Sequence, residues 1–209
     1  TIAPQNDQEN GTTMPIFTTG SLFNRGVVAL TDYVAGVRLE GIHHITCITG
    51  DAPGNVAFYA GTLGLRLVKK TVNQDDPTVY HLFYAGADIT FFEYPGARRG
   101  RAGAGMVHTI TWRVASDAAL DFWETRLTAA GVETARADGR LRFCDPEGLG
   151  LELAVVSTAD EPHVADHPEV PTELALQGFD GVRAFAEDTR ASRVLLEDVL
   201  AFVPAGDAR

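Results

Sequence analysis

The sequence predicts an α+β fold in which tandem βαβββ units form a curved mixed sheet. Three observations predict it. The order strand, helix, three strands occurs once in residues 39–95 and again in residues 106–156. A third copy of the opening strand and helix begins near residue 176, and the sequence stops at Arg209 before three further strands. With 45% hydrophobic and 22% charged residues, the 209-residue chain can bury a substantial core.

The first unit opens with a strand at residues 41–49. Asp51 is a suitable helix N-cap, Pro53 is tolerated in the first turn, and Gly64 ends the helix. Apolar residues recur between them at helical spacing, namely Val56, Tyr59, Ala60 and Leu63. We expect the three strands that complete this unit at residues 65–68, 78–84 and 89–94.

The second unit has the same pattern. Its opening strand covers residues 106–114, and Ser116 caps a helix that runs to Ala130 and ends at Gly131. Leu120, Trp123 and Leu127 lie on the apolar face of this helix. The expected strands are residues 132–135, 141–144 and 149–156, with a tight turn at residues 145–148.

The chain is expected to have four segments. Residues 1–36 form an N-terminal extension of uncertain order, residues 37–157 the paired units, residues 158–175 an exposed connecting loop, and residues 176–209 the start of an incomplete third unit. A repeat that is cut short cannot bury its apolar face alone. We therefore expect either a fragment of a longer protein or completion of the third unit by a partner chain, as in a homo-oligomer.

Composition excludes several classes of protein. The formal net charge of −11 disfavours nucleic-acid binding, because an acidic surface repels phosphate groups. No apolar run reaches the roughly 18 residues needed to cross a membrane. Cys47 and Cys144 are too few for a disulfide framework, which predicts two reduced, buried thiols in a cytoplasmic protein.

His44 is the first candidate site residue. Side chains alternate along a strand, so His44 shares one face with Ile42 and Ile48, and we expect that face to be enclosed or partly enclosed. A histidine there is either a core residue or a metal ligand. Alignment of the two units places Thr109 at the position of His44 and His108 at that of His43.

Glu93 and Glu152 are the candidate carboxylates, since each lies among apolar residues near the end of a unit's last strand. Burying an acid is costly unless it is paired or bound to metal. Either residue could instead point to solvent. Together with His44, one or both could begin a site for Fe(II), Mn(II) or Zn(II).

Several motifs resemble a known family. The segments that carry the resemblance are Leu39–Thr46, Gly50–Asp51, Phe58–Gly61, Leu63–Pro77, Tyr80–Tyr84 and Pro95–Gly100. They are similar to hydroquinone-type, extradiol ring-cleaving dioxygenases of the vicinal-oxygen-chelate, or glyoxalase/bleomycin resistance, superfamily. The resemblance covers residues 37–209 and is densest in the first unit.

The resemblance implies four βαβββ units and one Fe(II) or Mn(II) ion held by two histidines and a glutamate. The first ligand falls on His44, and the pocket residues fall on His43, as acid, base or hydrogen-bond donor, and on Thr46. The other two ligands come from a fourth unit that this sequence lacks. The implied reaction is O₂-dependent cleavage of a small hydroquinone- or catechol-type aromatic, for which a two-histidine, one-carboxylate centre leaves open positions.

Two other functions remain open. The first is a metal-free module that binds small ligands on the same fold. The second is a related metal isomerase or lyase, against which the segment Lys69–Pro77 argues. His81 is either a residue behind the metal ligands or a structural one, and Phe83, Phe91 and Phe92 are expected to lie in the core.

Overall fold

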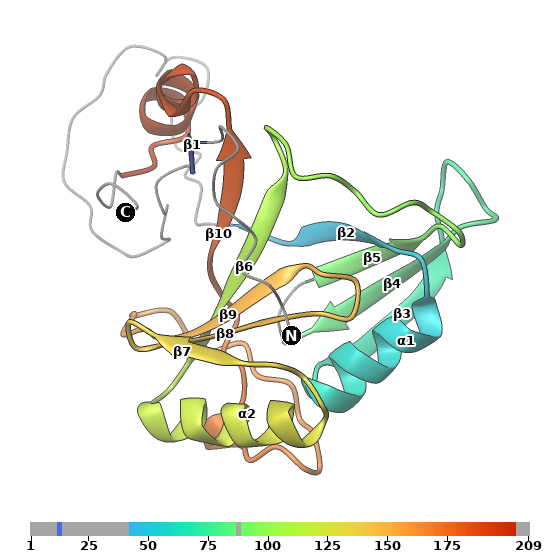
Figure 1. Ribbon diagram of the computed structural model, residues 1–209, viewed down its shortest axis with the longest axis vertical. Helices are drawn as coiled ribbons and strands as arrows, with labels where there is room; N and C mark the ends of the chain where they lie inside the picture. The colour runs from blue at the N-terminus through green and yellow to red at the C-terminus, as the bar shows by residue number, and fades with distance from the viewer. Residues whose placement is uncertain (1–11, 14–41, 87–88, 204–209) are drawn as a thin grey trace.

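The computed structural model describes residues 12–13, 42–86 and 89–203. Apart from Thr12 and Thr13, the expected extension at residues 1–36 lies outside the described residues. Figure 1 shows two sheets, each with a helix packed along one face. The predicted α+β fold of repeated βαβββ units is confirmed.

The first unit forms a four-stranded sheet in the order β2-β5-β4-β3. Its strands are β2 (Ile45–Thr49), β3 (Arg66–Val72), β4 (Tyr80–Ala85) and β5 (Ile89–Glu93). The first and last strands, β2 and β5, pair in parallel, whereas the other neighbours are antiparallel. The helix begins as α1 (Ala52–Val56) and continues as the π-helix η1 (Ala57–Thr62), a change of pitch that the sequence did not predict.

The second unit repeats this topology. Its strands β6 (Val107–Val114), β7 (Ala135–Ala137), β8 (Arg140–Cys144) and β9 (Gly150–Val155) lie in the order β6-β9-β8-β7, with β6 and β9 parallel. Its helix is α2 (Asp117–Ala129). β7 begins at the last residue of the strand expected at residues 132–135, because the chain leaves the helix through Gly131 and Val132 in a turn.

The predicted helix ends are confirmed. The Asp51 side chain accepts a hydrogen bond from the Gly54 N–H at 3.1 Å, and Ser116 Oγ accepts one from the Ala119 N–H at 3.3 Å. Gly64 and Gly131 follow the two helices with φ of +68° and +77°, which favours glycine. These caps lie where local sequence alone specifies them.

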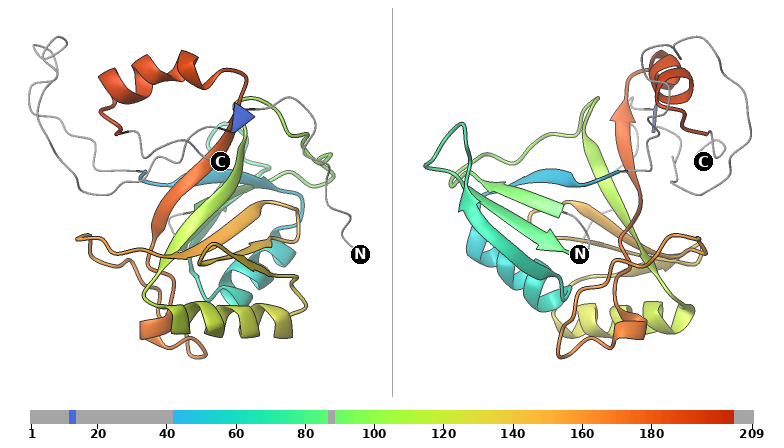
Figure 2. Two further views of the ribbon diagram at one scale, coloured as in Figure 1. Left: turned by 60° about the vertical axis from the view of Figure 1, so that its left-hand side comes forward. Right: turned by 180° about the vertical axis from the view of Figure 1, so that it is seen from behind.

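The opening strand of the third unit extends the second sheet. β10 (Phe179–Ala186) pairs with β6 in the antiparallel sense and with β1 (Thr12–Thr13) on its other side. It is followed by the short helices η3 (Thr189–Ser192) and η4 (Val194–Val199), which stand away from α1 and α2 in Figures 1 and 2. The Leu200 N–H to Leu195 carbonyl bond in η4 matches the Leu63 to Phe58 bond that ends η1.

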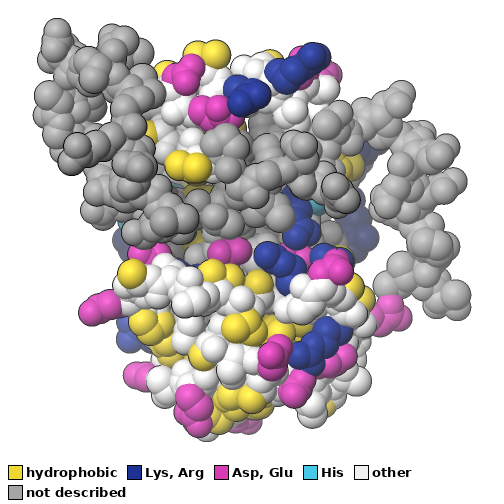
Figure 3. All heavy atoms as spheres, turned by 90° about the vertical axis from the view of Figure 1, so that its left-hand side faces the viewer, with side chains coloured by type: hydrophobic (Ala, Val, Ile, Leu, Met, Phe, Trp, Pro, Cys, Tyr) yellow, Lys and Arg dark blue, Asp and Glu magenta, His cyan; other side chains and the backbone are white. Residues whose placement is uncertain are grey.

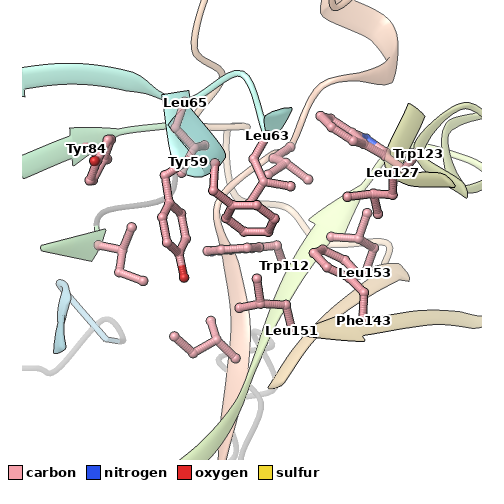
Figure 4. Packing of buried hydrophobic residues seen from close by; sticks show 14 of the residues in the cluster. Tyr59, Leu63, Leu65, Tyr84, Trp112, Trp123, Leu127, Phe143, Leu151 and Leu153 are labelled. Atoms are coloured by element: carbon pink, nitrogen blue, oxygen red, sulfur yellow. The ribbon is translucent and has the colours of Figure 1, made fainter. Parts of the chain in front are cut away.

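The core lies between each helix and its sheet and is continuous between the two units (Figure 4). Tyr59, Trp112 and Trp123 are fully buried within it. Part of the expected loop at residues 158–175 also packs here, since Val170 is buried and the Trp123 indole donates to the Leu174 carbonyl at 2.8 Å. The expected connecting loop is therefore exposed over most of its length and packs against α2 near its end, where the carbonyl of Leu174 in the short helix η2 (Thr172–Leu174) supplies the partner that a buried indole needs.

Direct polar contacts join the two units. The Tyr59 hydroxyl donates to Asp145 Oδ2 at 3.0 Å, and the Gly50 N–H donates to Glu147 Oε1 at 2.7 Å. Arg126 in α2 donates to the Thr62 carbonyl at 2.8 Å. Burial raises the pKa of Asp145, although hydrogen bonds from Leu149 and Tyr59 oppose that effect. The turn between β8 and β9 therefore fixes one unit to the other.

The two cysteines differ from expectation in one respect. Both are free thiols, but only Cys47 is partly buried, whereas Cys144 is exposed. Cys144 is the last residue of β8 and follows Phe143, whose side chain points into the core. Strand alternation therefore turns the Cys144 side chain outward.

Candidate metal and substrate site

His44 directly precedes β2, which begins at Ile45, and the face of the sheet on its side is open. Ile45, Cys47 and Thr49 point toward the core, while His44, Thr46 and Ile48 point away from it. Ile48 is 63% exposed. The expectation that this face is enclosed was wrong, because the helix α1–η1 covers only the opposite face of the sheet.

His43 and His44 contact each other directly. Their Nδ1 atoms lie 2.8 Å apart, and their rings meet edge to face with centroids 5.1 Å apart. Only one proton can occupy that short contact, so one ring donates and the other accepts. If His44 donates, its Nε2 is left without the proton and free to bind a metal, with His43 fixing the orientation of the ring.

Two threonines and three aromatic rings lie on the same face of the first sheet. Thr90 donates a hydrogen bond to Thr46 at 3.1 Å, which links β5 to β2. The His81 ring lies between Phe83 and Phe92, with its centroid 3.9 Å from each. Burial first, and then the charges of His44 and Lys69, lower the pKa of His81. Nε2 of His81 is enclosed and makes no hydrogen bond to the described residues.

The three phenylalanines divide between the two faces of the sheet. Phe91 is buried in the core, as expected, whereas Phe83 and Phe92 are only partly buried on the face of His44 and Thr46. The expectation that all three lie in the core was wrong for these two, because strand alternation separates Phe92 from its neighbour Phe91.

Glu93 lies on the other side of the sheet. It pairs with Thr49, whose side chain points to the core and which lies five residues beyond His44 along the chain, about 16 Å at the usual rise of a strand. Glu93 Oε1 instead accepts a hydrogen bond from the Ala52 N–H at 3.0 Å, at the start of α1. The structure therefore does not bring Glu93 and His44 together, and Glu93 stabilises the helix end.

Glu152 lies in the second sheet and is fully buried. Its carboxylate accepts hydrogen bonds from Arg140 at 2.6 Å, Arg142 at 2.8 Å and Arg183 at 2.9 Å. The Thr111 hydroxyl donates a further bond at 3.2 Å. Burial raises the pKa of Glu152, but the arginine hydrogen bonds and charges outweigh burial and hold it below its usual value. The carboxylate that was a candidate metal ligand is thus bound by the guanidinium groups of three arginines.

These arginines were not anticipated from the sequence. A signal was present, because Arg140 and Arg142 alternate along one strand and so share a face, and Glu152 needs partners among apolar neighbours. Within the ranges that the structure describes, no three His, Cys, Asp or Glu side chains are grouped closely enough to hold a metal ion. His44 is therefore the candidate ligand on this face, and a metal bound there needs further ligands from elsewhere.

His108, at the position of His43 in the second unit, has a different environment. Its ring stacks on Phe185 at 4.2 Å, and its Nδ1 lies 2.9 Å from Thr109 Oγ1. Burial and the charge of Arg183 lower its pKa from the ordinary value of 6.5. His108 therefore belongs to the packing of β6 against β10.

A pH dependence of stability follows from this environment. The unfolded chain binds a proton at His108 more readily than the folded chain, so the free energy of unfolding should fall as pH decreases below about 6.5 and should be unaffected by this residue above that value. Urea titrations of the wild type and His108→Gln at pH 7.5 and 5.5 measure it. An equal loss of stability at pH 5.5 in both proteins would contradict the assignment to His108.

Comparison with known proteins agrees with this fold. Residues 41–153, more than half of the chain, match the Glyoxalase/Bleomycin resistance protein/Dioxygenase superfamily. The chain belongs to this superfamily. No helix among the described residues is long and apolar enough to cross a membrane.

Three of the similar proteins are named as dioxygenases or putative dioxygenases. It is 40% identical over 179 residues to "Putative ring-cleaving dioxygenase MhqO" of Bacillus subtilis (strain 168), covering 81% of this chain and 57% of that protein. It is 35% identical over 156 residues to the chlorohydroquinone/hydroquinone 1,2-dioxygenase of Sphingobium indicum, covering 68% of this chain and 48% of that protein. A crystal structure of a putative dioxygenase from Bacillus subtilis matches with a TM-score of 0.70 and 38% identity, covering 80% of this chain and 60% of that one. The chain thus spans roughly half the length of the curated relatives it matches.

Proposed function

We propose that this chain contributes one half of a metal-dependent, ring-cleaving dioxygenase that acts on hydroquinone- or catechol-type aromatics with O₂. The similarity to ring-cleaving dioxygenases at 35–40% identity supports the reaction class. The observation that carries the assignment to this face is the His43–His44 pair, which is exposed and held by a 2.8 Å contact between the two rings.

The described residues of this chain supply part of a metal site. An exposed imidazole whose second nitrogen is hydrogen-bonded is the usual form of a histidine ligand, and His44 has that form. His44 would hold the Fe(II) or Mn(II) ion together with a histidine and a glutamate from outside the described residues. Such an ion, when bound, would supply open positions at which substrate and O₂ can meet and exchange electrons.

The other residues of this face would act on the substrate. His43 accepts the bond from His44 at Nδ1 and so carries its own proton at Nε2, where it could donate to a substrate oxygen. Thr46 accepts the Thr90 hydrogen bond, so its own hydroxyl proton remains available to a substrate oxygen. Phe83 and Phe92 would give the aromatic ring an apolar surface.

The edges of the two sheets support completion by a further unit. β6 has a parallel partner, β9, on one side and the opening strand of another unit, β10, on the other. β2 occupies the same place in the first sheet but, among the described residues, pairs only with β5. We infer that the open edge of β2 receives the opening strand of another unit, which would bring the remaining ligands beside His44.

Oxygen uptake tests the proposal. After anaerobic loading with Fe(II) or Mn(II), hydroquinone and catechol should cause oxygen consumption by the chain together with the C-terminal half of a relative, and none with His44→Ala. A metal-free binding module is the second candidate, because His44 lacks companion ligands among the described residues. Tight binding of these phenols without oxygen consumption in the complemented protein would favour that candidate and overturn the dioxygenase proposal.

A further inference from the structure

The open face of the first sheet carries basic side chains, although the chain as a whole is acidic. Cross-strand partners share a face, so the pairing of Arg66 with Ala85 and of Lys69 with Phe83 places both cations on the side of His81 and His44. Glu93 is the acidic residue in these four strands, and it lies on the opposite face. In a chain of net charge −11, this face carries basic groups and no strand carboxylate.

This distribution is not a general property of the surface. On the face shown in Figure 3, acidic and basic side chains are interspersed over the described residues. In the second sheet, the arginines of the equivalent face surround Glu152 and lie close to Asp180, so their charges are largely compensated. Among the described residues, Arg66 and Lys69 therefore place cations without a carboxylate partner on the face that carries the candidate metal ligand.

The cations lie beside aromatic rings. One cross-strand row runs from Thr46 through Thr90 and Phe83 to Lys69, and the Lys69 ammonium lies 5.9 Å from the centre of the Phe83 ring. The row crosses three strand spacings, about 14 Å. It begins beside the histidine pair and ends at a positive charge, with aromatic carbon between the two.

We propose that this face selects an aromatic substrate that carries a negatively charged substituent, such as a ring carboxylate, and that Lys69 is the residue that recognises this group. The inference rests on the proposed function, in which the hydroxyl end of the ring is held at His44. The ring then packs over Phe83 and Phe92, and the acidic substituent reaches the Lys69 ammonium, with Arg66 adding to the positive field. A neutral ring makes the apolar contacts but gains nothing from Lys69.

Binding to the metal-free full chain tests the proposal without any requirement for turnover. Hydroquinone and 2,5-dihydroxybenzoate differ by one carboxylate, and calorimetric titration should show the latter binding about tenfold more tightly at low salt. The preference should shrink as ionic strength rises. In Lys69→Gln the preference should fall to the small part that Arg66 supplies, whereas Lys69→Arg should retain it.

Lys70 provides a matched control. It is also exposed, but it pairs with the buried Leu82 and its ammonium lies 3.9 Å from the centre of the Tyr80 ring, on the other face of the sheet. Lys70→Gln should keep the full preference for the carboxylated ligand. Equal binding of both ligands to the wild type, or an equal effect of the two lysine substitutions, would overturn the proposal.

The binding experiment and the oxygen-uptake experiment can fail independently of each other. A carboxylate preference that depends on Lys69, without oxygen uptake in the complemented enzyme, would overturn the dioxygenase assignment and leave this inference standing. Oxygen uptake with hydroquinone, combined with equal binding of the two ligands, would do the reverse.

Discussion

Glu152→Gln should lower the free energy of unfolding by about 3–5 kcal/mol, the range measured when one partner of a buried ion pair is removed. Three guanidinium groups, from Arg140, Arg142 and Arg183, share this one carboxylate, which has no exposed surface. Glutamine has a similar shape but no charge, so the three cations would repel one another without compensation. Equilibrium unfolding in urea measures the loss.

Asp138→Asn is the control for this prediction. Asp138 lies 3.7 Å from Arg142 but is 84% exposed, so its removal should change stability by less than about 0.5–1 kcal/mol. If Glu152→Gln were equally mild, the arginines would be solvated in the folded chain, and the carboxylate would not be the centre of the cluster. Because the pKa of Glu152 is lowered, the stability that its ionised carboxylate contributes should also be lost as pH falls below the ordinary glutamate value of 4.5.

His44→Ala should abolish the binding of Fe(II) or Mn(II) under anaerobic loading. Loss of a partner behind a metal ligand already costs roughly 10- to 100-fold in affinity, and loss of the ligand itself should cost more. Metal content after desalting, measured by mass spectrometry, is the readout. His108→Ala should leave the metal content unchanged, since that ring stacks on Phe185 and lies in the second unit.

Both results bear on where the remaining ligands come from. Near-stoichiometric metal that depends on His44 in this chain alone would indicate that self-association completes the site. Metal that is retained only when the C-terminal half of a relative is added would indicate completion by that half. Equal loss in His44→Ala and His108→Ala would contradict the strand alignment that separates the two histidines.

The sequence predicted the elements that local chemistry controls. The caps at Asp51 and Ser116 and the glycines that end the two helices depend on residues a few positions apart, and each was placed correctly. The match between the first and third units also extended to the bond that ends each helix, from Leu63 and from Leu200. Side-chain period and capping residues are sufficient for such features.

The sequence failed where burial depends on a distant partner. Ile42 and Ile48 suggested an enclosed face, but a strand pattern cannot say which of two apolar faces a helix will cover. Glu152 looked like a ligand because it lies between leucines, and the three arginines that bind it come from two other strands. Pairing of that kind is a property of sheet order, which residue spacing does not specify.

The bond between Tyr59 and Asp145 has a consequence for how the chain melts. It connects the fully buried Tyr59 side chain, from the helix of one unit, to the hairpin turn of the next, so neither sheet can open without exposing an unpaired hydroxyl and carboxylate. Calorimetry should therefore record one heat-absorption peak for the two units, with equal calorimetric and van't Hoff enthalpies. A destabilising substitution in either sheet would then lower the melting temperature of both units together.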